Sequence, residues 1–371
     1  MYKICSVCVM DSSDPEIVFD DRGQCNHCRA AKEKLHKGWF PNEQGKKLLD
    51  AISEEIREYG GGKEYDCIIG VSGGVDSSYL LHLAKVEMKL NPLVVHVDAG
   101  WNSEIAVSNI EKMVNRLGLD LHTYVVDWAE MKDLQVAYLK SSLANQDVPQ
   151  DHAFFAKLYE FAGKKKIKYT LTGSNLSSES ILPAAWGYDA DDSIQIKAIH
   201  NKYGRVKLKS YPVMSFWKNK IYWPYLRRMV VVTPLNFIDY NKNKAIAFLE
   251  ENYGWRYYGG KHHESKWTKF FQAHYLPEKF GYDKRKAHFS SMIVAGQMSR
   301  VEAIKELEKP LYDDHELAED IFYIEKKLGL RAGDLRSFIQ LPNKTFADYP
   351  NQISLHGFFR CLKRVIKKDK L

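Results

Sequence analysis

Short apolar runs alternate with amphipathic stretches through the first two thirds of this chain. The apolar runs have the length and β-branched content of buried strands, and several of the stretches between them place apolar residues at helical spacing. This pattern predicts strands at residues 67–71, 93–97, 121–126, 169–171 and 229–232, with helices at 77–88, 103–117 and around 154–162. Such βα repetition predicts a parallel sheet covered by helices on both faces, with ligands binding beyond the carboxyl ends of the strands.

The pattern differs on either side of this region. An amphipathic helix is predicted at 46–59 and is broken by glycines at 60–62. Beyond about residue 236 only helical stretches follow, with 245–253 and 300–309 as candidates and aromatic-rich connections between them. We interpret this C-terminal part as helical, closing the crevice at the strand ends and carrying substrate contacts.

A glycine-rich loop joins the first predicted strand to its helix. Gly73 and Gly74 allow a sharp turn that presents successive N–H groups to an anion, and Asp76 is expected to cap the helix, whose positive end favours phosphate. The loop lacks the Lys of G-x-x-x-x-G-K-[ST], so it is not built around a γ-phosphate in that manner. An ordinary capped glycine turn is the alternative, but the strand, loop and helix context favours a phosphate site.

Two further segments lie at the predicted carboxyl ends of strands, at residues 98–101 and 172–175. Because the ends of parallel strands share one edge of the sheet, we expect both segments and the glycine-rich loop to converge on a single crevice.

Four of the six cysteines form two C-x-x-C pairs, with sixteen residues between the pairs. This spacing is typical of a structural zinc site with full tetrahedral coordination, as in a zinc ribbon. Two disulfides and a redox or sulfur-relay role are the alternatives. The predicted zinc ligands are Cys5, Cys8, Cys25 and Cys28.

These patterns predict four segments. They are a zinc-ribbon module at 1–45, a helical linker at 46–62, an α/β domain with the glycine-rich loop at 63–235 and a helical substrate-binding part at 236–371. No internal repeat is present.

Composition adds little to the functional argument. The 371 residues are 45% hydrophobic and 27% charged, which is ordinary for a globular protein. No apolar run reaches transmembrane length and the start has no signal-peptide pattern, so a cytoplasmic protein is expected. The net charge of +7 suits a polyanion or a nucleotide sugar equally. The lysine-rich runs at 164–168 and 363–368 are interpreted first as helix ends and a surface tail.

The motifs together resemble a known family. The S-G-G-x-D-S loop resembles the pyrophosphate loop (PP-loop) of the N-type ATP pyrophosphatases, which bind the β and γ phosphates of ATP as the leaving group. The cysteine segments at 5–11 and 23–28, with residues 96–101, 172–175 and 261–268, resemble the N-acetyl sugar amidotransferases of the WbpG/PseA type. This resemblance covers nearly the whole chain.

The resemblance implies an ATP-dependent conversion of an N-acetyl group on a nucleotide-linked sugar into an acetamidino group. The implied substrate is UDP-2,3-diacetamido-2,3-dideoxy-mannuronate, or a precursor of nonulosonic acids, in lipopolysaccharide O-antigen or related surface-polysaccharide biosynthesis. It also implies a separate glutaminase and a cyclase-like channel subunit, a pair similar to that of histidine biosynthesis.

The chemistry assigns roles to particular residues. Adenylation of an amide oxygen needs a loop for the β and γ phosphates, Mg²⁺ on the leaving pyrophosphate, and nearby cations. Asp76 is the candidate for orienting Mg²⁺, and Gly173 would permit close approach from a neighbouring strand. The predicted ATP-binding residues are Ser72, Gly73, Gly74, Val75, Asp76, Ser77, Val97, Asp98, Gly100 and Gly173, of which Val97, Asp98 and Gly100 would lie against the adenosine.

A second polar cluster follows at residues 261–264. Lys261 could balance phosphate charge, while His262, His263 or Glu264 could take a proton from attacking ammonia. A polar surface segment capping a helix is the alternative. Weaker candidates for phosphate or base contacts are Lys207, Lys209, Arg285, Trp217, Trp223, Trp255, Tyr257 and Tyr258.

No glutaminase signature is recognised in the chain. An N-terminal-nucleophile glutaminase needs Cys where this chain has Tyr2, and neither Cys67 nor Cys361 lies in a nucleophile elbow. We therefore expect ammonia to come from a partner or from solution.

Two rival interpretations remain open. A PP-loop enzyme that thiolates tRNA would explain the basic charge, although no C-x-x-C occurs after residue 28. A zinc-ribbon scaffold with a degenerate loop is the non-enzymatic rival, and the intact loop at 72–78 argues against it.

Overall fold

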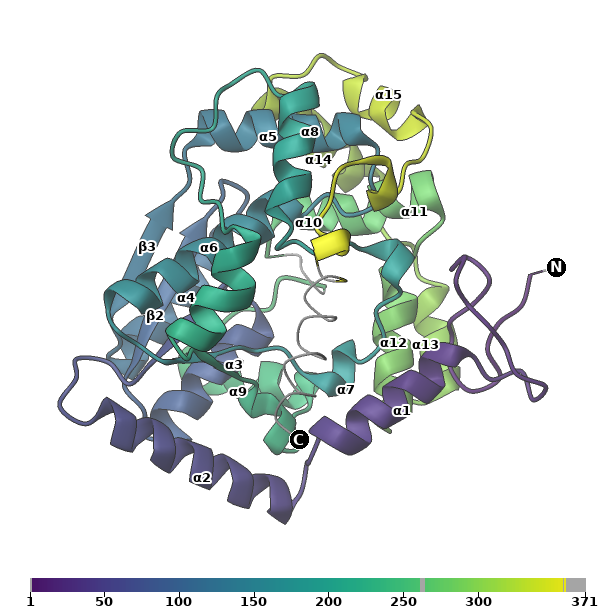
Figure 1. Ribbon diagram of the computed structural model, residues 1–371. Coiled ribbons are helices and arrows are strands. Elements are labelled where there is room, and N and C mark those ends of the chain that lie inside the picture. The colour runs from purple at the N-terminus through teal and green to yellow at the C-terminus, as the bar shows by residue number, and fades with distance from the viewer. Residues whose placement is uncertain (1, 261–263, 356, 358–371) are drawn as a thin grey trace.

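A five-stranded parallel sheet forms the centre of the protein (Figure 1). The computed structural model describes residues 2–260, 264–355 and 357. Strand order is β3-β2-β1-β4-β5, and all four pairings are parallel. The predicted α/β class and the five predicted strand positions are confirmed. The strands are β1 (Cys67–Gly70), β2 (Pro92–Asp98), β3 (Leu121–Val125), β4 (Tyr169–Leu171) and β5 (Val230–Val232).

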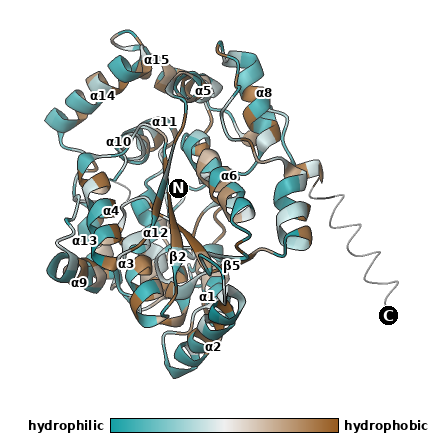
Figure 2. Cartoon of the chain, turned by 90° about the vertical axis from the view of Figure 1, so that its left-hand side faces the viewer, coloured by the Kyte–Doolittle hydropathy of each residue, from teal (hydrophilic) through white to brown (hydrophobic). Residues whose placement is uncertain are grey.

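Helices cover both faces of the sheet, as the continuous apolar runs of β1 and β2 require. In β1, Ile68 belongs to one hydrophobic cluster and Ile69 to a second. In β2, Val95 belongs to the first cluster and Val94 to the second, because successive side chains of a strand point to opposite faces. Figure 2 shows the strands β2 and β5 in brown among more hydrophilic helices.

Residues 26–237 form the following helices outside the strands, with η marking 3₁₀ or π helices. They are α1 (Asn26–Gly38), α2 (Glu43–Gly60), α3 (Val75–His82), η1 (Leu83–Glu87), α4 (Glu104–Leu117), α5 (Trp128–Ser141), α6 (Val148–Lys164), α7 (Leu176–Glu179), η2 (Ala184–Trp186), α8 (Ser193–Tyr203), η3 (Lys218–Leu226) and η4 (Pro234–Phe237).

The rest of the described chain is helical, as predicted. Its helices are α9 (Lys242–Tyr253), α10 (Lys266–Phe270), η5 (Phe271–Tyr275), α11 (Leu276–Phe280), α12 (Lys284–Val294), α13 (Arg300–Leu307), α14 (Asp314–Leu328), α15 (Asp334–Gln340) and η6 (Phe346–Asp348). Trp267 and Leu328 share a hydrophobic cluster with Val95 of β2, so these helices and the sheet have a common core.

Local signals explain the helix boundaries. Ser103 caps α4 by accepting a hydrogen bond from Ala106 N, and Gly118 ends the helix with φ of +57°. The expected cap at α3 is wrong. Gly74 is the N-cap residue, and Asp76 lies within the first turn, because the helix begins two residues earlier than predicted.

Among the described residues, no helix is both long and apolar enough to cross a membrane.

Candidate functional site

The loop between β1 and α3 leads into the amide end of a helix. Gly73 has φ of +80°, and a Cβ there would lie 2.4 Å from the carbonyl oxygen of Ala106. Only glycine fits, because both the backbone conformation and the space exclude a side chain. Gly74 N donates to Ser72 Oγ at 3.3 Å, and Ser77 Oγ donates to Gly74 O at 3.2 Å. The loop is therefore held in a shape that suits an anion at the start of α3.

Two tyrosines contact the start of α3. Tyr240 donates its hydroxyl hydrogen to the Asp76 carboxylate. Burial, reinforced by Asp76, raises the pKa of Tyr240 well above its usual value, so the hydroxyl stays protonated and remains a donor. Val75 N donates to Tyr258 Oη at 3.2 Å, and burial also raises the pKa of Tyr258. Thus one tyrosine orients the predicted magnesium ligand and the other contacts the helix amides.

Gly173 brings the end of β4 against α3. A Cβ at Gly173 would lie 3.0 Å from the carbonyl carbon of Asp76 and 3.1 Å from Ser77 N. Backbone atoms cannot yield as a flexible side chain can, so this approach depends on glycine.

The end of β2 is tied to the end of β1. Asp98 Oδ1 accepts from Gly100 N at 2.7 Å and from Asn102 Nδ2 at 3.1 Å. His96 Nδ1 lies 2.9 Å from Val71 O, and its Nε2 lies 3.0 Å from Asn102 Nδ2. The side chain of Val97 belongs to the core cluster of the sheet, so only its backbone can border a ligand.

Glu264 lies beside the loop. Ser103 N donates to Glu264 O at 2.8 Å, and Lys266 N donates to Trp101 O at 3.0 Å. These bonds hold residues 264–266 against the end of β2. A Cβ placed on Gly74 would lie 3.2 Å from Oε1 of Glu264.

The other three members of the 261–264 cluster, Lys261, His262 and His263, lie outside the described residues.

Sequence reasoning missed Lys327. Its ammonium group comes from α14, donates to the carbonyl oxygen of Gly100 and to Tyr323 Oη, and lies 5.1 Å from the ring centroids of Trp101 and Trp128. No local pattern marks it, because its partner is 227 positions away. Tyr240 was also missed, and Tyr258 was considered only for stacking.

A cavity has a volume of about 1120 Å³. The loop residues 72–77 do not line it, but Ser174, which follows Gly173, and Tyr257 and Gly259, which flank Tyr258, do. The opposite wall comes from α12 and α13. Its charged lining residues are Glu179, Lys242, Lys269, Asp283, Lys284, Arg285, His288, Glu302, Glu306 and Lys309.

Several of these charges are already paired. Arg285 binds Asp283 at 2.8 Å and donates to the carbonyl oxygens of Leu307 and Lys309 at the end of α13. Lys269 pairs with Glu316. Arg285 therefore fixes the cavity wall rather than serving as a simple phosphate contact, whereas Lys207 and Lys209 are not among the lining residues.

A buried carboxyl lies behind the same wall. Asp147 accepts from Gln150 Nε2 at 2.7 Å and from Thr268 Oγ1 at 3.2 Å. Burial raises its pKa to about 6, while the charge of Lys284 opposes that rise. No sequence pattern had marked Asp147.

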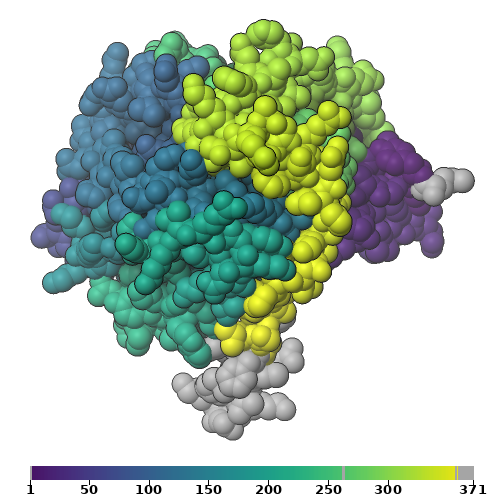
Figure 3. Space-filling model, turned by 90° about the horizontal axis from the view of Figure 1, so that it is seen from above, coloured from purple at the N-terminus to yellow at the C-terminus, as the bar shows by residue number. Residues whose placement is uncertain are grey.

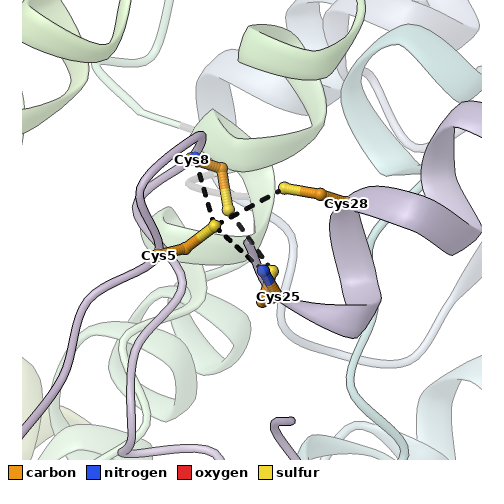
Figure 4. Close-up of side chains that lie close together, drawn as sticks. All are labelled: Cys5, Cys8, Cys25 and Cys28. Carbon is orange, nitrogen blue, oxygen red and sulfur yellow. Dashed lines mark hydrogen bonds between the residues drawn. The ribbon is translucent and has the colours of Figure 1, made fainter. Parts of the chain in front are cut away.

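The four N-terminal cysteines gather in one buried cluster (Figure 4). All four sulfur atoms lie within 4.8 Å of one another. The sulfurs of Cys5 and Cys28 are 3.8 Å apart and those of Cys8 and Cys25 are 3.7 Å apart, far beyond the length of a disulfide bond. Backbone amides donate to the sulfur of Cys5 from Val7 and Cys25. The donor set and its N–H···S bonds fit a tetrahedral Zn²⁺ held by four thiolates.

The cysteine module is docked on the wall of the cavity. Arg300 donates to the carbonyl oxygens of Cys8 and Cys5, and Val9 N donates to Ser290 Oγ at 3.2 Å. Lys286 forms an ion pair with buried Asp11. Figure 1 shows α1 beside α12 and α13, and Figure 3 shows the purple N-terminal segment against the yellow-green C-terminal part.

Comparison with known proteins distinguishes the region that contains the sheet from the C-terminal helical region. A family model for the phosphoadenosine phosphosulfate reductase domain matches residues 66–241, the region that contains the sheet and the loop. A model described as "LPS biosynthesis protein WbpG-like, C-terminal domain" matches residues 264–364. The chain belongs to the WbpG-type family of the PP-loop superfamily. The fold and the family predicted from its motifs are thereby confirmed for this WbpG-type chain.

Curated relatives match only in part. An uncharacterized protein of Methanocaldococcus jannaschii is 31% identical over 34% of this chain, and a tRNA(Ile)-lysidine synthase of Actinobacillus pleuropneumoniae is 23% identical over 77%. The WbpG-type chain spans about half the length of these relatives, 44% and 58% respectively.

Two solved structures are also similar. An NH3-dependent NAD synthetase from Campylobacter jejuni matches with a TM-score of 0.31 and 17% identity, covering 72% of this chain and 97% of that one. An NMN synthetase from Francisella tularensis matches with a TM-score of 0.32 and 13% identity, covering 81% and 97%.

Gly173→Ala tests the close approach of β4 to α3. The added methyl would push the strand end away from the loop, so we expect ATP to bind about tenfold more weakly, with little change in melting temperature. Isothermal titration with a non-hydrolysable ATP analogue measures the effect. Gly187→Ala is the matched control, because a Cβ there meets only one atom, at 3.9 Å. Unchanged affinity in G173A would show that this contact does not shape the nucleotide site.

Cys25→Ser tests the metal cluster. Losing one thiolate should remove bound zinc and loosen the wall formed by α12 and α13, which lowers the thermal stability. Metal analysis and a melting curve measure both effects. Cys67→Ala is the control, since its buried thiol lies in β1 and away from the cluster. Full zinc content in C25S would contradict the assignment.

Proposed function

We propose that the protein is a cytoplasmic, ATP-dependent amidotransferase that acts on a nucleotide-linked N-acetyl sugar. The observation that carries this proposal is a cavity of about 1120 Å³ lined by residues that adjoin the contacts of the phosphate loop, Ser174 beside Gly173 and Tyr257 and Gly259 beside Tyr258, with part of its wall in the WbpG-like segment. The proposed substrate is UDP-2,3-diacetamido-2,3-dideoxy-mannuronate, and the proposed pathway is lipopolysaccharide O-antigen or surface-polysaccharide biosynthesis.

ATP would bind with its β and γ phosphates at the start of α3. Ser72 and Ser77 lie there, and the helix dipole favours the negative charge. The amides of Gly74 and Val75 and the hydroxyl of Ser77 donate within the protein, so they would exchange these partners for the phosphates. Bound Mg²⁺ would neutralise the leaving pyrophosphate, with Asp76 as the protein ligand that Tyr240 orients. The adenosine would lie against the end of β2, near Asp98 and Gly100.

The sugar nucleotide would occupy the cavity. Its volume suits a ligand of this size, and its lining mixes polar groups with cations such as Lys242 and Lys284. The mixed charge suits a diphosphate joined to a sugar carboxylate. The acetamido group would then face the loop from the side of Ser174 and Tyr257.

The reaction would proceed in two steps. The amide oxygen attacks the α phosphorus, forming an O–P bond while the bond to the β phosphate breaks and pyrophosphate leaves. Ammonia then adds to the carbon of this O-adenylated imidate, and AMP departs with the oxygen. The nitrogen of ammonia thereby becomes part of the amidine, and one proton released from the ammonia passes to a base. Glu264 lies next to the loop and is our candidate for that base, with Lys261 and His263 proposed from their motif alone.

Ammonia would be supplied by a separate glutaminase, delivered through a cyclase-like channel subunit. This part of the proposal is based on the family resemblance and on the missing glutaminase signature.

A PP-loop enzyme that modifies tRNA is the second candidate. It is favoured by the lysidine synthase relatives, which match over 77% of this chain at 23% identity. Adenylation of a base carbonyl would use the same loop, so substrate dependence distinguishes the two candidates.

The decisive assay combines ATP, Mg²⁺, ammonium and UDP-diacetamido sugars with the purified protein. We expect AMP and pyrophosphate to form only with the sugar, together with a product in which C=O has become C=NH, detected by mass spectrometry. Formation of ADP would contradict the mechanism. AMP formation that depends on tRNA and not on any sugar would favour the second candidate.

Asp76→Ala tests the metal role. Without the carboxylate, Mg²⁺ and the pyrophosphate lose their protein anchor, so AMP formation should fall at least about a hundredfold. Zinc content and melting temperature should stay unchanged. Asp50→Ala, an exposed carboxylate on α2, is the matched control. Near-normal turnover in D76A would refute the role assigned to Asp76.

A further inference from the structure

The turn between α12 and α13 is bonded to the segment that leads into α9. Gln297 Nε2 donates to Tyr240 O at 2.6 Å. Because a backbone carbonyl can only accept, the amide group of Gln297 must present its nitrogen there. Gln297 belongs to the WbpG-like segment, whereas Tyr240 belongs to the region matched by the other family model. This hydrogen bond therefore joins the two regions.

The side chain of Tyr240 has a different partner. Its hydroxyl donates to the Asp76 carboxylate, the proposed protein ligand of Mg²⁺. Tyr240 is 3% exposed and its ring centroid lies 5.4 Å from that of Tyr79, so the ring has little freedom to turn. Figures 1 and 2 show α9 beside α3, the helix that carries Asp76. A shift of the Tyr240 backbone would therefore also move the hydroxyl that orients Asp76.

Gln297 also lines the cavity proposed for the sugar nucleotide. Asn243, three positions after Tyr240, lines the same cavity from α9. Among the residues that the structure describes, none donates a hydrogen bond to Oε1 of Gln297. A hydroxyl or an amide N–H of a bound sugar is the kind of donor that this oxygen accepts.

The backbone around Gln297 is held on both sides. Gln297 N donates to Met292 O at 2.9 Å, and Gly296 adopts φ of +75° in the turn. Ser299 begins α13 with a capping box, and Arg300 beside it donates to the cysteine module. The side chain of Gln297 therefore extends from a fixed turn toward Tyr240.

We propose that Gln297 is a positioning residue that connects the cavity to the Asp76 carboxylate through Tyr240. A ligand that donates to Oε1 would hold the side-chain amide in the orientation that bonds Tyr240 O. The Tyr240 hydroxyl then keeps Asp76 oriented for Mg²⁺. The sugar nucleotide and magnesium-bound ATP should therefore bind cooperatively. This inference rests on the proposed function, because it places Mg²⁺ at Asp76 and the sugar nucleotide in the cavity.

A purely structural bond is the alternative. Gln297 would then only fasten the turn to α9, and its loss would lower the melting temperature without a specific effect on Mg²⁺. Magnesium dependence separates the two, because the orientation of Asp76 affects nucleotide binding chiefly when the metal is present.

Nucleotide binding with and without Mg²⁺ tests the connection. The probe is a non-hydrolysable ATP analogue, and isothermal titration measures its dissociation constant. We expect Gln297→Met to weaken binding about fivefold with Mg²⁺ and to leave binding in EDTA unchanged. Gln297→Glu keeps the shape of the side chain but loses the donor, so it should behave in the same way. Met298→Leu is the matched control, because Met298 lines the same cavity from the next position, and its binding should equal that of the unmodified chain.

A double-mutant cycle tests whether the effect passes through Tyr240. Tyr240→Phe keeps the ring and removes the hydroxyl, so it should weaken magnesium-dependent binding about tenfold. Adding Gln297→Met should weaken it little further, because the two residues act in series. Melting temperature and zinc content must be equal in all variants, which separates loss of binding from loss of folding.

Cooperativity is measured by repeating the titration with UDP-2,3-diacetamido-2,3-dideoxy-mannuronate present. In the unmodified chain, saturating sugar nucleotide should tighten binding of the magnesium-bound analogue about fivefold. In Gln297→Met this gain should vanish, whereas Met298→Leu should keep it.

Three results would overturn the inference. The first is magnesium-dependent binding and sugar-induced gain in Gln297→Met that equal those of the unmodified chain. The second is a loss as large in EDTA as with Mg²⁺, which would assign Gln297 a structural role alone. The third is fully additive losses in the double variant, which would exclude Tyr240 as the connection. If the unmodified chain itself failed to bind the analogue, the proposed function would be overturned instead, so the two failures are distinguishable.

Discussion

The close backbone contacts around the start of α3 are the constraint on which the rest of the structure depends. Gly73 lies against the Ala106 carbonyl of α4, and Gly173 lies against the Asp76 carbonyl, so three segments meet where no side chain fits. Their convergence follows from the parallel sheet, which brings the carboxyl ends of its strands to one edge. Because these contacts involve main-chain atoms, the shape of the loop is set by the fold and changes little with side-chain rotamers. Residues that adjoin these contacts, such as Ser174 beside Gly173, then line the cavity.

The cysteine module extends this arrangement to the opposite wall. A segment of a few dozen residues has too little apolar surface to build a stable core alone, and four thiolates around one ion can replace much of that core. Arg300 and Lys286 connect the module to α13 and α12, two helices that line the cavity. Thus the cysteines stand far from the proposed reaction, yet they support the wall that the substrate would contact.

Much of this architecture could be predicted from local patterns, because the strands and the loop carry short-range signals. The five strands and the helix at 103–117 were all predicted from the sequence. The helix cap at Asp76 was assigned wrongly, since a backbone turn at Gly74 starts the helix without any side chain. Tyr240 and Lys327 could not be found, because their partners lie 164 and 227 positions away. Contacts of that range arise from packing of the C-terminal helices on the sheet, which no local pattern specifies.

The tyrosines at the loop show how the C-terminal part could couple to the phosphate site. Tyr258 accepts a hydrogen bond from Val75 N, an amide that a phosphate at the start of α3 would also seek. A bound phosphate must therefore compete with the phenol, and the stronger charge-assisted bond favours the phosphate. Tyr258 is followed by Gly259, which lines the cavity and has φ of +90°, so the backbone there adopts a conformation natural only to glycine. Displacing the phenol would shift a segment that borders both the loop and the cavity, and occupancy of one site would thereby alter the other.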